Sequence, residues 1–159
     1  MQSYARPEER LKELHLELPP PPKPVAVYRP ALLVGSLLYL AGHGPLRRDG
    51  TLITGKLGRE LNVEQGKLAA RQTGLAILST VRNTLGSLDK VKRLVKTLGL
   101  VNCIPDFTDH PQVINGFSEL MAEVFGKDAG IGVRSAVGAS SLPADMAVEI
   151  ECIFEVETT

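Results

Sequence analysis

An arginine and a glutamate near the end of the chain have the residue types and the spacing of a site for a small carboxylate. Arg134 lies fifteen residues before Glu149, and two adjacent strands turning near Leu142 and Pro143 would bring them close in register. Arginine presents a planar fork of donors that matches a carboxylate. A glutamate can hold a water molecule or accept its proton. The pair could therefore orient a small acid beside an activated water, and a surface ion pair is the alternative.

The segment that carries Glu149 alternates in polarity, as a β-strand with one buried face does. Its apolar residues pack on one side, and the other side carries four carboxylates, which are Glu149, Glu151, Glu155 and Glu157. Such a row repels itself unless solvent or cations surround it. Either it is a solvent-facing edge, or one of the glutamates faces a cation. Arg134, on the preceding predicted strand, is the candidate cation.

Two amphipathic helices are predicted upstream of this strand. Asn62 can cap the first helix, because Gln65 three residues later completes a capping box, and Gly86 ends it. Its apolar stripe is Leu68, Leu75, Leu78, Val81 and Leu85. Asp109 and Pro111 open the second helix, which ends at Gly126. Its stripe is Val113, Phe117, Leu120, Met121 and Val124.

Short β-branched and apolar runs predict the strands. Three of them lie at 25–28, 31–34 and 37–41, with Asp49-Gly50 as a hairpin signal further on. Residues 90–101, 132–139 and 146–157 complete the set. The order predicts an α+β fold with a single mixed sheet of about six strands and two helices packed on one face. Since no layer remains for the other face, we expect oligomerisation through it.

Composition indicates one globular domain with a short N-terminal extension. The 159 residues are 43% hydrophobic and 23% charged, which is close to the globular average. Residues 1–24 contain a predicted helix after Pro7 and a proline-rich strap, and 25–159 form the α+β domain. The N-terminus has no apolar signal-peptide core. The longest apolar stretch, 31–41, is far shorter than a membrane span. We expect a cytoplasmic protein with no membrane contact.

The charge balance argues against a dedicated nucleic-acid binder. Eighteen basic residues match eighteen acidic ones, so the formal net charge is zero, whereas such binders carry a basic excess. One basic cluster does occur, consisting of Lys90, Lys92, Arg93 and Lys96. It is either a solvated strand edge or a contact for RNA phosphates.

Several motifs in order resemble the reactive-intermediate deaminase family, known as RidA, YjgF or L-PSP. The C-terminal signature is Arg134-Ser135-Ala136-Val137, then Leu142-Pro143, then Val148-Glu149-Ile150-Glu151. Upstream, the run from Leu38 to Pro45 is similar to the first core strand of the family and its following turn. The resemblance extends from residue 25 to 156 and leaves the first 24 outside it.

The resemblance implies a site and an assembly. In the family, the arginine matching Arg134 binds the substrate carboxylate, and the glutamate matching Glu149 positions the hydrolytic water. Tyr28, Asn115 and Ala136 fall at positions that resemble its substrate-binding residues. Members close three sheets into a trimeric barrel, with sites at subunit interfaces, and use no cofactor or metal. A carboxylate beside the arginine is expected to stay ionised, with a lowered pKa.

The implied activity is hydrolysis of 2-imino or enamine acids, such as 2-aminoacrylate, to 2-keto acids and ammonia. One alternative is a non-catalytic protein that binds a keto acid or another small carboxylate. A second is an L-PSP-type endoribonuclease or translation inhibitor. The sequence departs from the family at Ala41, His43 and Gly138, and these changes bear on the preferred substrate. His43 is either a catalytic base or a hydrogen-bonded structural histidine.

Overall fold

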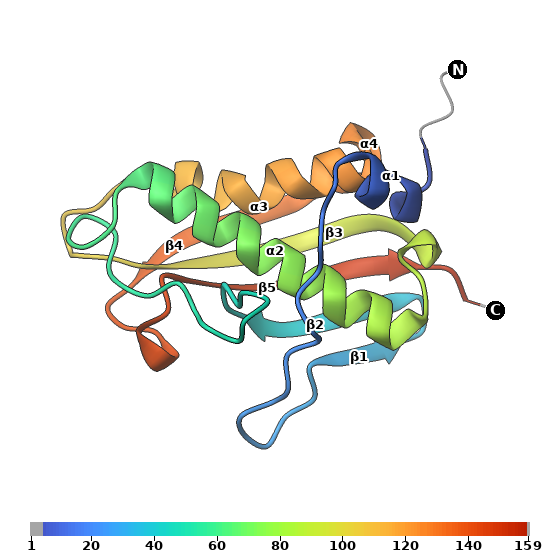
Figure 1. Ribbon diagram of the computed structural model, residues 1–159, viewed down its shortest axis with the longest axis horizontal. Coiled ribbons are helices and arrows are strands. Elements are labelled where there is room, and N and C mark those ends of the chain that lie inside the picture. The colour runs from blue at the N-terminus through green and yellow to red at the C-terminus, as the bar shows by residue number, and fades with distance from the viewer. Residues whose placement is uncertain (1–4, 159) are drawn as a thin grey trace.

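One mixed sheet organises the chain in the computed structural model, which describes residues 5–158 (Figure 1). Its five strands run in the order β1-β2-β5-β3-β4. β3 and β4 are parallel, and every other neighbouring pair is antiparallel. The strands are β1 (Ala31–Val34), β2 (Leu37–His43), β3 (Val91–Asn102), β4 (Val133–Ala139) and β5 (Val148–Val156).

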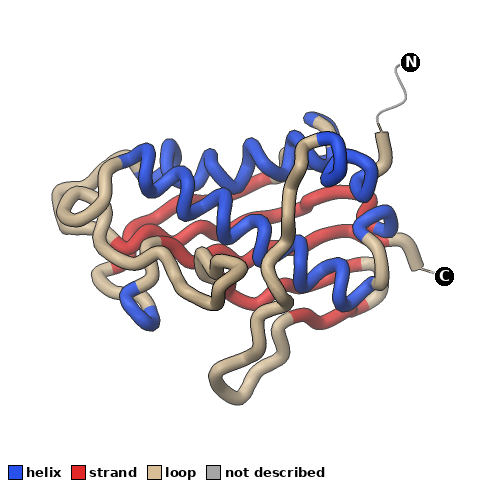
Figure 2. The backbone as a smooth tube through the Cα atoms, in the orientation of Figure 1, coloured by secondary structure: helices blue, strands red, loops and turns tan. Residues whose placement is uncertain are grey.

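Two long helices, α2 (Val63–Leu85) and α3 (His110–Phe125), cover one face of this sheet (Figures 1 and 2). The core lies between the two layers, where Phe117 of α3 and Phe154 of β5 are fully buried. The remaining helical segments are short, namely α1 (Pro7–Glu13), α4 (Lys127–Gly130) and the 3-10 turns η1 (Leu88–Lys90) and η2 (Pro143–Asp145). The α+β class and the helical layer on one face are therefore confirmed.

The caps of α2 agree with the sequence prediction, but its apolar stripe differs in part. The Asn62 side chain accepts from the Gln65 N–H at 2.9 Å, and the Gln65 side chain accepts from the Asn62 N–H at 2.8 Å. Leu68 was predicted in the core and is 64% exposed instead. The two helices approach closely at Gly116 of α3, where an added Cβ would lie 2.0 Å from the Lys67 carbonyl oxygen of α2.

The sixth predicted strand does not form. Residues 25–28 make bends without a strand partner, and the Val25 and Val27 side chains are 92% and 106% exposed. Their β-branched character predicted a strand, but these residues form bends in the connection that leads to β1. Asp49-Gly50 does form a turn, with φ of +87° at Gly50, although its flanks join through one isolated bridge, Leu46 to Leu52.

The expected hairpin between β4 and β5 is wrong, because β3 lies between them. The connection between the two strands passes the end of β3, where Asn102 fixes it. The Asn102 side-chain amide donates to the Asp145 carboxylate and to the Met146 carbonyl, both at 3.1 Å. Local polarity patterns cannot reveal a strand inserted from elsewhere in the chain, so the predicted register failed.

The N-terminal segment crosses the outer side of the helical layer (Figure 2). The Glu8 carboxylate on α1 accepts from Arg82 Nη2 at 2.6 Å and from the Leu88 N–H at 2.9 Å. Further along, Ser79 Oγ on α2 donates to the Pro19 carbonyl at 2.6 Å. The proline strap, residues 19–24, is thus held against α2. Residues 1–4 of the predicted N-terminal extension lie outside the described residues.

Within residues 5–158, none of the helices combines the length and the apolar character required to cross a bilayer.

Candidate active site

Glu149 lies on the uncovered face of the sheet, where β5 passes β2. Its cross-strand neighbour on β3 is Leu100. On the β2 side it packs against Gly42, where an added Cβ would come within 2.6 Å of the Glu149 Oε1 atom. Only glycine admits the carboxylate this closely, so Gly42 sets the position of Glu149.

A β-bulge in β2 brings Gly42 to this position. Leu40 pairs with Cys152 and His43 pairs with Ile150, so two residues of β2 face one residue of β5. Bulges redirect side chains and occur beside active sites. Here the extra residue falls within the Gly42 turn that resembles the family motif.

A cavity of about 770 Å³ contains Glu149 and Tyr28. Four segments surround it: the proline strap, the β2 bulge, the loop around Gly50 and the turn before β5. Ala41 and Glu151 also line it. The cavity therefore unites two of the five predicted site residues, together with two of the family departures, Ala41 and His43.

The electrostatic environment of Glu149 differs from the expected one. Burial raises the pKa of its carboxyl, and the neighbouring charge of Glu151 raises the pKa further. Among residues 5–158, the Glu149 carboxylate has no hydrogen-bond partner. The expected lowering of its pKa by Arg134 is not found within one chain, because the two side chains point to opposite faces of the sheet.

Arg134 lies on the helix-facing side of the edge strand β4. Its cross-strand neighbour is the buried Thr97. Arg134 Nη1 donates to Ser118 Oγ at 3.0 Å, and Nη2 donates to the Pro111 carbonyl at 3.1 Å. Partial burial lowers the pKa of the guanidinium. These bonds fix the arginine against α3 and leave its other donors available.

Asn115 and Ala136 lie at this same edge. Asn115 occupies α3 one turn from Pro111 and one turn from Ser118, the two residues that hold Arg134, so all three follow one helix face. Ala136 lies two residues after Arg134 on the same face of β4, opposite Gly99, and packs against the core. The five predicted residues thus form two groups, one in the cavity and one at the β4 edge.

His43 is a structural histidine. Its Nδ1 atom lies 2.6 Å from the Ala41 carbonyl and its Nε2 atom 2.8 Å from Thr80 Oγ1. The carbonyl can only accept, so Nδ1 carries the proton and Nε2 accepts from the threonine hydroxyl. Burial lowers the pKa of the ring. With both nitrogens occupied by structural bonds, the hydrogen-bonded alternative is confirmed over the catalytic base.

Gly138 faces away from the cavity. A Cβ at this position would lie 2.8 Å from His110 Nε2 and 2.9 Å from Cys103 Sγ. Its departure from the family therefore accommodates the contact between Cys103 and His110, whose atoms are 3.5 Å apart.

Part of the cavity wall was not predicted. The end of the strap, residues 22–24, lines the cavity together with Val25 and Ala26 just after it, as do Met146 and Ala144 in the turn before β5. Ala144 and Asp145 both have φ of +54°, a conformation that non-glycine residues rarely adopt. The proline run was a visible signal for a rigid segment, but nothing in the sequence indicated what it covers.

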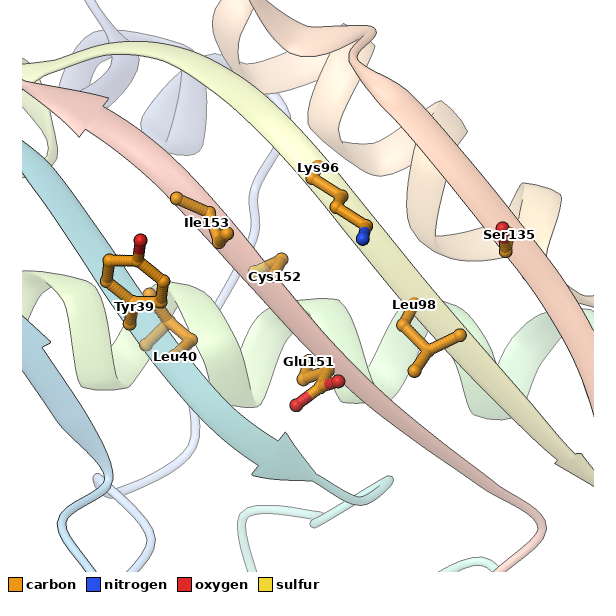
Figure 3. Close-up of a pocket in the computed structure, with 8 residues that line it drawn as sticks. All are labelled: Tyr39, Leu40, Lys96, Leu98, Ser135, Glu151, Cys152 and Ile153. Carbon is orange, nitrogen blue, oxygen red and sulfur yellow. The ribbon is translucent and has the colours of Figure 1, made fainter.

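Two residues of the basic cluster, Arg93 and Lys96, have different surroundings in the structure. Arg93 Nη2 donates to the Asp128 backbone carbonyl at 2.8 Å, and its cross-strand neighbour is Glu155. Lys96 instead lines a shallow hollow of about 260 Å³ on the uncovered sheet face. Figure 3 shows Lys96, Tyr39 and Glu151 projecting from three adjacent strands around it.

The sequence of this chain is similar to those of known proteins. The sequence model of the family described as "YjgF/chorismate_mutase-like, putative endoribonuclease" matches residues 8–153. Protein TCP17 of Trypanosoma cruzi is 38% identical over 146 residues, which are 92% of this chain and 91% of that protein. A 2-iminobutanoate/2-iminopropanoate deaminase of Dermatophagoides farinae is 29% identical over 144 residues, covering 89% and 95% of the two chains.

The architecture also matches a solved structure. The Agrobacterium tumefaciens protein Atu1372, of unknown function, has a TM-score of 0.86 and 38% identity, covering 96% of this chain and 92% of that one.

Proposed function

Since the chain belongs to the YjgF/RidA family, we propose that it hydrolyses small 2-imino or enamine acids to 2-keto acids and ammonia. The division of the site into two groups is the observation that carries the proposal. Glu149 lies in a cavity without a cationic partner from its own β4, and Arg134 projects at the sheet edge with donors to spare. A second copy of the chain can bring the two together. The deaminase named among the relatives supports this reaction class.

The uncovered sheet face supports assembly as a homotrimer with sites between subunits. Cross-strand register places a series of apolar residues on this face. Leu32, Val34, Tyr39, Val133 and Val137 are each at least 42% exposed in the single chain. Exposed apolar side chains on an uncovered sheet face favour an interaction site there. Burying it between copies would also bring the β4 edge of one chain to the cavity of the next.

The proposed reaction needs only the groups present in such a shared site. Arg134 of one subunit holds the substrate carboxylate, which orients the imine carbon toward Glu149 of its neighbour. Glu149 accepts a proton from water as the water oxygen attacks that carbon, and the C=N electron pair moves to nitrogen, which takes up this proton from Glu149. In the resulting carbinolamine, the hydroxyl proton passes through Glu149 to the nitrogen as the C–N bond breaks, so ammonia leaves and the 2-keto acid remains.

A raised pKa suits Glu149 to the base role. A general base is most effective when its pKa lies near the working pH, and burial moves the pKa of Glu149 upward, in that direction. Tyr28 and the Gly42 backbone complete the surroundings of the reacting carbon, because both line the same cavity.

The test is direct measurement of turnover. An imine of alanine or 2-aminobutyrate is generated in the presence of the protein, and keto-acid formation is followed against buffer alone. We expect acceleration, and a loss of about 100-fold or more in kcat/KM for Arg134→Lys, because lysine keeps the charge but cannot present two parallel donors. Thermal unfolding checks that the variant remains folded.

Two results would contradict the proposal. No acceleration for any small imino acid excludes the deaminase. Binding of 2-ketobutyrate that is lost in Arg134→Ala but kept in Glu149→Ala, without turnover by the natural sequence, would instead show a carboxylate-binding protein.

A further inference from the structure

The cavity around Glu149 is far larger than a three-carbon imino acid requires. It measures about 770 Å³, whereas pockets of roughly 300–1,000 Å³ enclose ligands of drug size. A substrate such as 2-iminopropanoate has only a methyl group beyond its reacting carbon. The cavity of the single chain therefore leaves room on its strap side for a substrate with a longer side chain.

The additional space is bounded mainly by apolar groups. Val25 comes from the bend that follows the strap, Leu46 and Leu52 from the loop around Gly50, and Met146 from the turn before β5. Prolines of the strap add further apolar surface. The charged residues that line the cavity are Lys23, Glu149 and Glu151. Apart from Lys23 and the reacting region, this wall offers contacts mainly to hydrocarbon.

The strap wall is fixed to the fold. The Ser79 hydroxyl holds the strap at Pro19, and the bonds from Arg82 and the Leu88 amide to Glu8 hold the helix before it. The proline run restricts the backbone between this anchor and the cavity. On the opposite side, Met146 packs against Gly44, where a Cβ would lie 2.4 Å from its sulfur. A methionine can adapt its shape to a variable side chain.

We infer that the proline strap makes this site selective for 2-imino acids with long apolar side chains. Glu149 and the apolar wall line one cavity, so a substrate whose imine carbon lies at Glu149 extends its side chain along the strap. This inference rests on the proposed function and narrows its substrate class. Ala26 is the specificity-determining position to test, because it lines the cavity and its side chain is exposed.

The experiment compares the imines of leucine and alanine, each generated by an L-amino-acid oxidase, on the complete protein. We expect kcat/KM to be at least about tenfold higher for the leucine imine, since each additional buried carbon favours the longer substrate. Ala26→Phe fills the cavity and should lower the leucine-to-alanine ratio by about tenfold. Val27→Phe is the matched control, because the adjacent Val27 is fully exposed and does not line the cavity.

The outcomes separate this inference from the proposed function. Hydrolysis of neither imine overturns the proposed function and this inference with it. Either of two results overturns the inferred substrate class alone. One is hydrolysis that favours the alanine imine. The other is a leucine-to-alanine ratio that Ala26→Phe and Val27→Phe leave equally unchanged. If Ala26→Phe fails to fold, Leu52→Ala replaces it. Loss of contact at that wall should also lower the ratio, and an unchanged ratio overturns the inference.

Discussion

Glu8 on α1 and Glu149 on β5 are both partly buried, yet their surroundings differ. Burial by itself would raise the pKa of Glu8, but hydrogen bonds from Arg82 and the Leu88 amide, with the positive charge of Arg82, lower it overall. Burial likewise raises the pKa of Glu149, and there the nearby charge of Glu151 adds to the effect.

The difference separates a structural carboxylate from one available for chemistry. Glu8 receives its donors from its own chain and thereby docks α1 on the helical layer. Glu149 receives none within residues 5–158 and faces a cavity. Perturbed titration in a cleft marks a functional candidate, whereas a fully paired carboxylate marks a structural contact. The carboxylate of Glu8 is thus paired within one chain, whereas that of Glu149 receives no donor among residues 5–158.

The largest expected effect tests whether a second copy completes the cavity. Arg134→Ala and Glu149→Gln should each lose about 1,000-fold or more in kcat/KM, because each removes one half of the shared site. Mixing them after subunit exchange should restore activity. In a statistical trimer mixture, about a quarter of the sites would pair an intact arginine with an intact glutamate.

The matched control for this mixture is Arg134→Ala with Asn115→Ala. Both residues belong to the β4 and α3 edge of one chain, so hybrids of this pair should remain inactive. Activity in the control mixture, or none in the first one, would contradict the division of the site between chains.

A smaller effect is expected from Gly42→Ala, which disturbs Glu149 without removing it. The new methyl group would lie 2.6 Å from Oε1, so the carboxylate must move away. We expect kcat/KM to fall about 10- to 100-fold, as small displacements of catalytic groups do. The unfolding temperature should change little, because a half-buried side chain can rotate. A variant that retains full activity would show that the position of Glu149 against Gly42 is irrelevant.

The features that sequence could predict are local ones. The capping box at Asn62, the stop at Gly86 and the alternation of β5 each depend on neighbours a few residues apart. The order of the strands depends on β3, which inserts between β4 and β5. Periodicity carries no information about that insertion, and the expected proximity of Arg134 to Glu149 in one chain failed with it.

The candidate site, too, could be predicted from the sequence only in part. The resemblance identified Glu149 and Tyr28, which share a cavity, and Arg134 with Asn115, which share an edge. It gave no indication that the proline strap lines the cavity, because the strap lies outside the matching motifs. Its position depends on a long-range bond between Ser79 and Pro19.

Glu8 is the structural carboxylate of the two, so Glu8→Gln should destabilise the fold. The variant keeps the shape but loses charge-assisted bonds to Arg82 and Leu88, a loss of about 1–2 kcal/mol. This corresponds to about 2–8 °C in unfolding temperature for a chain of this size. Glu9→Gln on the exposed side of α1 is the matched control and should have no effect.

The pH dependence of the Glu8 effect follows from its lowered pKa. A carboxylate with a lowered folded-state pKa stabilises the protein above its unfolded-state pKa, and that stability is lost as the pH falls through the folded value. The difference between the natural sequence and Glu8→Gln should therefore be full at neutral pH and shrink in acid. A difference that grows in acid would mean that Glu8 is not the ionised partner of Arg82.

The smallest expected effect is a shift in the pH profile of kcat/KM, which reports on Glu149 in the cavity. If Glu149 acts as the base, kcat/KM rises with pH as Glu149 loses its proton. The charge of Glu151 opposes that ionisation and contributes to the raised pKa of Glu149. Glu151→Gln removes the charge and should move the acid limb of the profile to lower pH. Glu157→Gln, an exposed change beyond the end of β5, should leave the limb in place. A limb that stays fixed or moves upward in Glu151→Gln would show that another group sets it, and Glu149 would lose its assignment as the base.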